Sequence, residues 1–416
     1  MQTNLADFIR DTSAGREADA ILRSCVHCGF CNATCPTFQL LGDELDGPRG
    51  RIYLIKAMLE GQPVSATTQL HLDRCLSCRA CETTCPSGVN YHRLLDIGRE
   101  VLEQRVPRSA RSRATRFLLR AVLPRERLFR PVLRASQMLQ PLLPRALAGK
   151  VPKPATVAPP WPRSPGRQRK LITLAGCVQP ALAPNTNAAT ARVLDRLGIE
   201  LVEVKGSACC GALRYHLDAQ PQALADMRRV IDACWPYVVS GRVEGVVMTA
   251  SGCGAHVREY GAMLRHDPAY AEKAARIAAL TRDVSEVMVA EQERLLVLLA
   301  QTGRGGGQRV AFHSPCTLQH AQKIRGVVEG LLLAAGYQLT PVADGHLCCG
   351  SAGTYSITQP ELSRQLREQK LAAMRAGSPA LLVTAHVGCQ RHLQSGSRRP
   401  VRHWIELIDE RLRGVG

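Results

Sequence analysis

The spacing of apolar residues predicts a helical N-terminal part of the chain. Between residues 51 and 59, Ile52, Ile55 and Leu59 recur at steps of three and four residues, which is the period of an amphipathic helix. The richest apolar run of the chain, 295–300, is about a third of the roughly 18 residues that a membrane-spanning helix needs. We therefore expect any membrane association of this chain to be peripheral.

The C-terminal half contains two apolar runs with the composition of buried strands. These runs are 171–175 and 310–312, and helical stretches follow them at 190–197 and 321–335. A buried strand followed by a helix is the building block of a parallel α/β sheet, and here it occurs twice. We expect two α/β units of the same kind, with ligating side chains at strand ends and in loops.

The cysteine pattern indicates that these two units are copies of one another. The first copy contains Cys177, Cys209, Cys210 and Cys253, and the second contains Cys316, Cys348, Cys349 and Cys389. The first interval is 32 residues in both copies, and the second interval is 43 residues in one and 40 in the other. A glycine follows each adjacent cysteine pair, so we call each copy a CCG repeat. Because cysteine is an uncommon residue, matching intervals of this kind indicate an internal duplication.

Length and composition are those of a multidomain globular protein. The 416 residues are too many for one hydrophobic core, and the shares of 45% apolar and 21% charged residues are ordinary for folded domains. An aromatic share of 4% argues against a nucleic-acid reader built from base-stacking platforms. The first dozen residues resemble no signal or transit peptide, so we expect a cytoplasmic protein whose 17 cysteines mostly hold metal rather than form disulfides.

The positive charge is concentrated in one segment. Residues 105–170 carry seventeen Arg and Lys against one acid, Glu126, in a chain whose net charge is +19. Leu and Phe alternate with these arginines, a pattern typical of a basic amphipathic helix on an anionic bilayer. Because four prolines interrupt the pattern, we favour a second interpretation: the apolar face packs on the chain's own domains or on a partner, and the arginines face solvent. A Pro-rich, extended linker is expected at 151–165.

Two cysteine motifs within the first hundred residues have the spacing of iron–sulfur ligands. Each reads Cys-x2-Cys-x2-Cys-x3-Cys-Pro, which bacterial ferredoxins use to bind [4Fe–4S] clusters. The fourth cysteine of such a run reaches the other cluster. We therefore assign Cys25, Cys28, Cys31 and Cys85 to cluster 1, and Cys35, Cys75, Cys78 and Cys81 to cluster 2. Two zinc sites are the alternative, although zinc needs four ligands and the doubled motif supplies an ordered eight.

Charged residues lie within and beside these motifs. His27 is inside the first loop, and because eight thiolates complete two clusters we expect it to pack or to tune a potential rather than to bind metal. Arg74 and Arg79 flank the second motif, where positive charge favours the reduced cluster. Solvated surface arginines are the alternative for both.

The sequence around these motifs resembles the iron–sulfur subunit of bacterial glycolate oxidase (glycolate dehydrogenase). The resemblance is carried by residues 25–31 (CVHCGFC), 42–51 (GDELDGPRGR), 314–320 (SPCTLQH) and 347–355 (LCCGSAGTY), and it extends over nearly the whole chain. It implies a complex in which a flavoprotein subunit carrying FAD oxidises glycolate to glyoxylate. This chain would pass the electrons toward membrane quinone, at the cytoplasmic face of the inner membrane.

The expected fold class is α + α/β. A helical ferredoxin-like domain with two [4Fe–4S] clusters occupies 1–104, a basic helical and Pro-rich linker occupies 105–169, and two duplicated α/β CCG repeats occupy 170–303 and 304–416. The sequence contains no Walker motif and no GxGxxG after a strand, so we do not expect the isolated chain to oxidise glycolate. It contains no recognised nucleic-acid-binding module, so we do not expect it to bind nucleic acid. Because a partner would choose the substrate, D-lactate and glycerol 3-phosphate remain open alternatives.

The CCG repeats also resemble those of heterodisulfide reductase, which end in CxxC and hold a non-cubane [4Fe–4S] cluster. Here the endings are Cys253-x2-His256 and Cys389-x2-His392, so each repeat offers four cysteines and a candidate histidine. We expect a metal or redox function, as an additional iron–sulfur cluster, in at least one repeat; structural sites or metal-free thiols are the alternative. A catalytic subunit that reduces a heterodisulfide or quinone here is the second functional hypothesis.

Other residues near these cysteines are interpreted as structural. Cys234 lies outside the duplicated pattern and is expected to be a small buried hydrophobe. The histidines near the second repeat's cysteines are expected to be packed or surface residues; they are His313, His320, His346 and His386.

Overall fold

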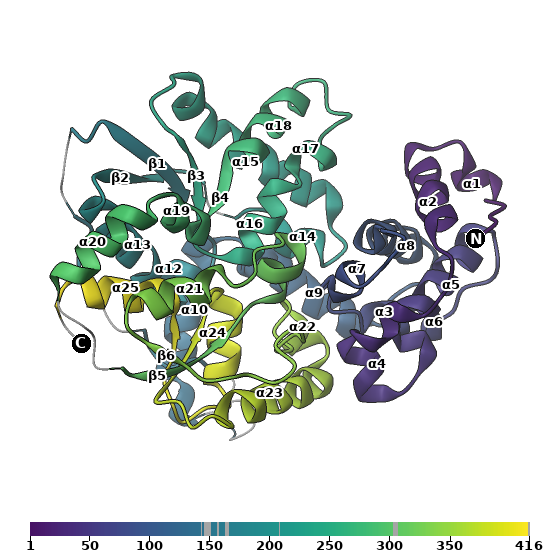
Figure 1. Cartoon of the computed structure of the whole chain (residues 1–416). Helices are drawn as coiled ribbons and strands as arrows, with labels where there is room; N and C mark the ends of the chain where they lie inside the picture. The colour runs from purple at the N-terminus through teal and green to yellow at the C-terminus, as the bar shows by residue number, and fades with distance from the viewer. Residues whose placement is uncertain are drawn as a thin grey trace.

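The structure is a computed structural model that describes residues 1–142, 144, 151–155, 158–162, 166–207, 209–302 and 307–414. A helical N-terminal part lies beside two α/β units, each built on one sheet (Figure 1), and the predicted fold class is confirmed. In the described ranges, no helix is both long and apolar enough to cross a membrane. The boundary that we predicted between residues 303 and 304 lies outside the described residues.

The N-terminal part is a set of short helices around two longer ones. In chain order they are α1 (Asp7–Arg10), α2 (Ser13–Ser24), α3 (Phe30–Ala33), α4 (Pro36–Leu41), the 3-10 turn η1 (Glu44–Asp46), α5 (Pro48–Leu59), α6 (Ala66–Asp73), α7 (Ala80–Thr83) and α8 (Tyr91–Arg105). The helix predicted over 51–59 is confirmed as α5, which buries Ile52, Ile55 and Leu59. It crosses α8 closely, since a Cβ on Gly98 would lie 2.8 Å from Cγ1 of Ile55.

Two basic helices connect the N-terminal part to the repeats. They are α9 (Ala110–Val122) and α10 (Glu126–Met138), followed by η2 (Gln140–Leu142). Our preferred interpretation of this segment is wrong for one part of α9: Arg111 and Arg113 face solvent as expected, but Arg116 faces inward and two apolar residues do not pack on the chain's own domains. Arg116 is buried and donates to Asp218 at 2.7 Å and to Asp73 at 3.1 Å, whereas Phe117 and Leu118 are exposed. The inward face is thus specified by two distant carboxylates rather than by hydrophobicity.

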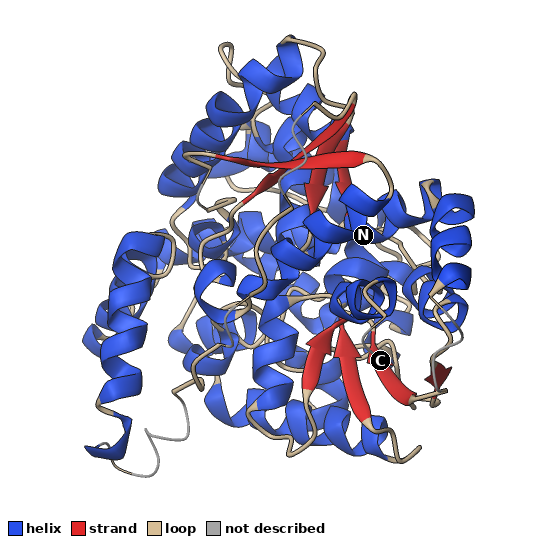
Figure 2. Ribbon diagram, turned by 90° about the vertical axis from the view of Figure 1, so that its left-hand side faces the viewer, coloured by secondary structure: helices blue, strands red, loops and turns tan. Residues whose placement is uncertain are grey.

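The first CCG repeat contains a parallel four-stranded sheet in the order β2-β1-β3-β4. Its elements are β1 (Arg169–Leu174), α12 (Gln179–Leu182), α13 (Pro184–Arg196), β2 (Ile199–Val204), α14 (Ala212–Tyr215), α15 (Gln220–Val239), β3 (Gly245–Met248), α16 (Ser251–Arg258), α17 (Tyr260–Met263), α18 (Ala271–Leu280), β4 (Thr281–Asp283), α19 (Val284–Ala290) and α20 (Gln292–Gln301). The apolar run predicted as a strand is β1, and helices cover both faces of the sheet (Figure 2).

The second CCG repeat has the same topology, with the strand order β6-β5-β7-β8. Its elements are β5 (Arg309–His313), the π-helical turn η3 (Thr317–Ala321), α21 (Val327–Ala334), β6 (Gln338–Leu339), α22 (Tyr355–Thr358), α23 (Pro360–Arg375), β7 (Leu381–Thr384), α24 (Val387–Gln394), β8 (Val401–His403) and α25 (Trp404–Leu412). The helix predicted from residue 321 begins only at Val327, because Lys323 and Gly326 adopt left-handed backbone conformations with φ of 58° and 71°.

The two repeats share one hydrophobic core. The helix between the first two strands of each repeat packs on the helix that follows the last strand of the other, α13 against α25 and α21 against α19, as expected for a pseudo-twofold arrangement. Trp404 is completely buried in the shared core, and Arg192 on α13 pairs with Asp409 on α25 at 2.6 Å. The duplicated half therefore holds together as a single unit.

The N-terminal part docks on this unit through buried ion pairs. Glu259, between α16 and α17, accepts from Arg79 and lies 3.2 Å from Nε2 of His92. Nδ1 of His92 lies 2.8 Å from Glu82. Burial alone would lower the pKa of His92, but its hydrogen bonds with Glu259 and Glu82 raise that pKa from 6.5 to about 9. At neutral pH, His92 is therefore a cation between two carboxylates.

We expect this docking to weaken as the pH rises from about 6.5 to 9. A histidine whose pKa is raised by folding adds stability below its ordinary pKa and loses it as the pH passes the raised value. The raised pKa of His92 corresponds to up to about 3 kcal/mol of the free energy of unfolding. Urea unfolding across this window should show a loss of stability in the native chain and a much flatter profile in His92→Gln. A matched substitution of an exposed histidine, His266→Gln, should keep the native slope; an unchanged slope in His92→Gln would contradict the assignment.

Candidate metal centres

The two N-terminal motifs fold into loops with the same backbone. The residue before the second cysteine of each motif has a positive φ, 59° at His27 and 52° at Ser77. The residue after the second cysteine does so as well, with φ of 86° at Gly29 and 60° at Arg79. These left-handed turns curl each loop so that its cysteines face inward. Arg79 tolerates a conformation better suited to glycine, and its guanidinium pairs with Glu259.

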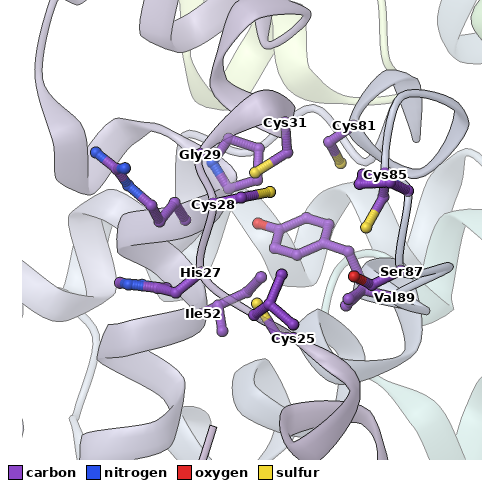
Figure 3. Close-up of a pocket in the computed structure, with 15 residues that line it drawn as sticks. Cys25, His27, Cys28, Gly29, Cys31, Ile52, Cys81, Cys85, Ser87 and Val89 are labelled. Carbon is purple, nitrogen blue, oxygen red and sulfur yellow. The ribbon is translucent and has the colours of Figure 1, made fainter.

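The cysteines assigned to cluster 1 line one pocket. The sulfur atoms of Cys25, Cys28, Cys31 and Cys85 turn toward a common space, with Cys81 behind them (Figure 3). Cys28 is exposed, and so are the neighbouring side chains of Val26 and Phe30. This pocket therefore opens to solvent. His27 is exposed, with its ring 6.5 Å from that of Tyr53, and does not enter the sulfur group.

The cysteines assigned to cluster 2 line a second, deeper pocket. They are Cys35, Cys75, Cys78 and Cys81, of which all but Cys75 are fully buried. Cys81 and Tyr91 line both pockets, so the two sulfur groups are direct neighbours. The hydroxyl of Tyr91 donates to Sγ of Cys75 at 3.6 Å.

A buried arginine adds positive charge beside the deeper pocket. Arg51 is 1% exposed, and its Nη1 donates to Sγ of Cys35 at 3.9 Å and to the hydroxyl of Thr37 at 3.1 Å. Its counter-charge is Asp46, which also accepts from Arg74 at 2.7 Å. Burial lowers the pKa of Arg51, but the charges of Cys75 and Cys35 outweigh it and raise that pKa. Arg74 and Arg79 are thus ion-paired, and the alternative of solvated arginines is wrong.

The chemistry of both pockets fits iron–sulfur clusters. The outer pocket is lined by five cysteines and the deeper one by four, with Cys81 shared, and the deeper one has no carboxylate or imidazole in its lining. Burial, and then the charge of Cys25, raise the pKa of Cys31 to about 11. Burial and the charge of Cys78 likewise raise the pKa of Cys81. Thiolates crowded in this way repel one another unless a cationic centre lies between them, which is what bound iron supplies.

The cysteines of each CCG repeat converge at the carboxyl ends of its strands. In the first repeat, Cys177 follows β1 and Cys253 follows β3. These strands are neighbours in the sheet, and the strand order extends from them in opposite directions, to β2 on one side and to β4 on the other. Open α/β sheets bind ligands at such a switch point. Neighbouring thiols shift one another's pKa along one row, from Cys177 through Cys209 and Cys210 to Cys253, so the four sulfur atoms lie close together.

The second repeat repeats this row of thiols and adds a histidine. Sγ of Cys316 donates to Sγ of Cys348 at 3.8 Å, and Cys348 and Cys389 both raise the pKa of the neighbouring Cys349. Ligand atoms of His313, Cys349 and Cys389 all lie within 4.8 Å of one another. From the sequence we interpreted His313 as a packed or surface residue, because it precedes the first cysteine of the repeat and lies at the end of a buried strand.

The histidines at the ends of the two repeats do not complete these groups. His392 bonds to Ser363 through Nε2, at 3.2 Å from both the hydroxyl and the carbonyl oxygen. His256 packs among aromatic rings, 5.6 Å from Tyr215 and 5.9 Å from Tyr260. His320 bonds to Thr83 at 3.0 Å, and Cys234 is completely buried, as expected for packed residues.

One cysteine of the deeper N-terminal pocket lies against the second repeat. Cys78 and Leu76 share a buried apolar cluster with Cys316, Cys348 and Tyr355. The pKa of Cys78 is raised by burial and then by the charge of Cys348, so these sulfur atoms are near neighbours. The sulfur atoms therefore form a continuous series, from exposed Cys28 through both N-terminal pockets to the second CCG repeat.

Comparison with known proteins agrees with this arrangement. Residues 21–89 match the 4Fe-4S dicluster domain family, and residues 172–258 and 310–394 both match the Cysteine-rich domain family called CCG. The chain is 27% identical over 244 residues to lactate utilization protein A of Bacillus licheniformis, which covers 56% of this chain and 97% of that protein.

Two relatives cover nearly the full length. The chain is 31% identical over 406 residues to the probable glycolate oxidase iron-sulfur subunit of Bacillus subtilis, covering 91% of this chain and 89% of the relative. It is 54% identical over 413 residues to the glycolate oxidase iron-sulfur subunit of Escherichia coli, covering 99% of each. Because the motifs, the duplicated sheets and the full-length identity agree, the chain belongs to the family of glycolate oxidase iron–sulfur subunits.

Proposed function

We propose that this chain carries electrons within a flavin-dependent glycolate dehydrogenase. A flavoprotein subunit holding FAD would oxidise glycolate to glyoxylate, and this chain would pass the electrons toward quinone at the cytoplasmic face of the inner membrane. The observation that carries the proposal is the series of sulfur groups, which begins at exposed Cys28 and continues inward to Cys348. A chain of electron carriers needs an accessible end that a donor protein can reach and an interior protected from solvent, and this series has both.

The ligands in this proposal are the residues assigned from the sequence. Cys25, Cys28, Cys31 and Cys85 would hold cluster 1, and Cys35, Cys75, Cys78 and Cys81 would hold cluster 2. The pockets support this assignment, because each is lined by the four cysteines assigned to it. When bound, such clusters take up and release single electrons. The division into 1–104, 105–169 and two repeats remains part of the proposal.

The isolated chain is proposed to lack glycolate oxidation of its own. Purified anaerobically and mixed with glycolate, it should stay oxidised by EPR until the flavoprotein subunit is added, and then show reduced [4Fe–4S] signals. Reduction by glycolate without a flavoprotein would contradict the proposal. Reduction of a heterodisulfide by the isolated chain with an artificial donor would instead favour the catalytic alternative.

The flavoprotein is proposed to dock at the mouth of the cluster 1 pocket. Val26 lies in the first cysteine loop and Phe30 begins α3, and these apolar side chains are 69% and 63% exposed. Exposed apolar groups beside a solvent-open redox site are typical of a docking surface.

A charge in this mouth should therefore slow reduction by the partner. We expect Val26→Asp to lower the rate of glycolate-dependent cluster reduction about tenfold or more, while reduction by dithionite is unchanged. The matched control is Val239→Asp on α15, since Val239 is 67% exposed and lies outside the cysteine loops. Equal rates in the two variants, measured by stopped-flow absorbance, would show that the flavoprotein does not dock at the mouth of this pocket.

The basic helices are proposed to rest on an anionic membrane surface. On α10 and the turn after it, Leu128, Val132 and Leu139 are exposed on one face, with Arg127 and Arg134 exposed beside them. Basic amphipathic helices of this kind bury an apolar face at the headgroup boundary. This placement supports peripheral association, and it would bring the chain close to quinone.

Membrane association should depend on both charge and apolar surface. The chain should co-sediment with vesicles containing anionic phosphatidylglycerol and not with neutral phosphatidylcholine vesicles, and salt should weaken the binding. Val132→Asp should reduce the bound fraction several-fold, whereas Leu296→Asp on α20, another exposed apolar position, should not. Capture of the chain by the flavoprotein through this face, with no vesicle binding, would overturn the membrane assignment.

Donors to the sulfur atoms should set the potential of cluster 2. The Tyr91 hydroxyl donates to Sγ of Cys75, and such hydrogen bonds stabilise the more negative, reduced form. Losing one hydrogen bond of about 1 kcal/mol in Tyr91→Phe should lower the midpoint potential by about 40 mV. EPR-monitored redox titration measures this shift, and Tyr53→Phe serves as the exposed control. A cluster 2 potential that is equal in Tyr91→Phe and the native chain would contradict the ligand assignment of Cys75.

A further inference from the structure

The buried side chain of His313 has no partner for either of its ring nitrogens. It is the last residue of β5 and is 1% exposed. Among the described residues, neither Nδ1 nor Nε2 makes a hydrogen bond. Leaving a buried polar group unpaired costs about 1–3 kcal/mol, so native proteins seldom do so without a reason. A ligand at this position would remove that cost.

Four sulfur atoms lie on the same side of the second sheet as this imidazole. One nitrogen of His313 and the sulfur atoms of Cys349 and Cys389 are mutually within 4.8 Å. The row continues from Cys349 to Cys348, whose sulfur is 3.8 Å from that of Cys316. Sulfur and imidazole nitrogen together are the donor set of iron–sulfur clusters with a histidine ligand.

The first repeat has no imidazole at the position of His313; its buried His256, whose Nε2 also lacks a hydrogen bond among the described residues, follows the last cysteine instead. Counting back from the first cysteine of each repeat, the residue that matches His313 is Leu174, at the end of β1. The equivalent strands β1 and β5 thus differ at their last residue, which precedes the first cysteine of each repeat. The duplication therefore contains two unlike sites.

A buried cation marks the second site as anionic. Lys370 on α23 is 3% exposed, and its Nζ donates to the carbonyl oxygen of Asp344 at 2.7 Å. Burial lowers the pKa of Lys370, and negative charge on Cys349 and Cys348 opposes this effect. The matching position in the first repeat is Ile231. A buried ammonium is stable only beside compensating negative charge, which a thiolate-bound cluster provides.

We propose that the second CCG repeat holds an iron–sulfur cluster ligated by its four cysteines and by a ring nitrogen of His313. The inference deepens the proposed electron transfer, on which it rests, by naming the group that follows cluster 2. Cys78 of cluster 2 packs against Cys316 and Cys348 of this site. As a fifth ligand, a neutral imidazole leaves the cluster less negative than a fifth thiolate would, which raises its reduction potential. The second repeat is therefore suited to receive electrons from the N-terminal part.

Pulsed EPR on the holoprotein tests the nitrogen ligand directly. The anaerobically purified chain should contain more than the roughly eight irons of two cubanes. One reduced signal should show hyperfine coupling to an imidazole ¹⁴N. His313→Leu installs the residue of the first repeat and should lose this coupling and the extra iron, while His313→Cys should keep the extra iron without the coupling. The control is His392→Gln, the histidine at the end of the same repeat, which should leave the coupling unchanged.

The result can be separated from failure of the proposed function. Both N-terminal clusters should keep their EPR signals and their glycolate-dependent reduction in His313→Cys. Zinc in the second repeat, only about eight irons in the native chain, or nitrogen coupling that persists in His313→Leu would overturn the histidine ligand. Loss of the N-terminal signals from the native chain would instead overturn the proposed function itself.

Discussion

The packing of Cys78 against the second CCG repeat is the contact on which the rest of the arrangement depends. It places Cys78, a proposed ligand of cluster 2, in the same buried apolar cluster as Cys316 and Cys348. The hydroxyl of Tyr355 fixes this junction by donating to the carbonyl oxygen of Arg74 at 2.9 Å. On the other side, Glu259 of the first repeat holds Arg79 and His92. The N-terminal part thus contacts both repeats, and its deeper sulfur group lies against the second repeat through Cys78.

The duplicated half shows how a symmetric scaffold can acquire unlike sites. Both repeats present four cysteines at the switch point of a parallel sheet, and each repeat covers the other with its terminal helices. The differences are confined to a few side chains, such as His313 in place of Leu174. The scaffold is preserved by the shared core around Trp404, so a change at a strand end alters the chemistry without altering the fold.

Local patterns predicted much of this molecule. The spacing of the N-terminal cysteines predicted both sulfur groups, because tight loops bring ligands together over short distances in the chain. The helix at α5 and the strands β1 and β5 followed from apolar periodicity. In contrast, the inward face of α9 depends on Asp73 and Asp218, which are far away in the sequence. Arg51 was missed, and His313 was interpreted as a packed or surface residue, for the same reason: their surroundings are set by tertiary neighbours rather than by any local motif.

The central claim is that two neighbouring [4Fe–4S] clusters occupy the N-terminal pockets. Because Cys81 and Tyr91 line both pockets, the clusters must be close enough for their electron spins to interact. EPR of the fully dithionite-reduced native chain tests this most directly. The account predicts a broad, split spectrum from two magnetically coupled clusters. A colourless, zinc-containing protein, or a spectrum of a single isolated cluster, would contradict it.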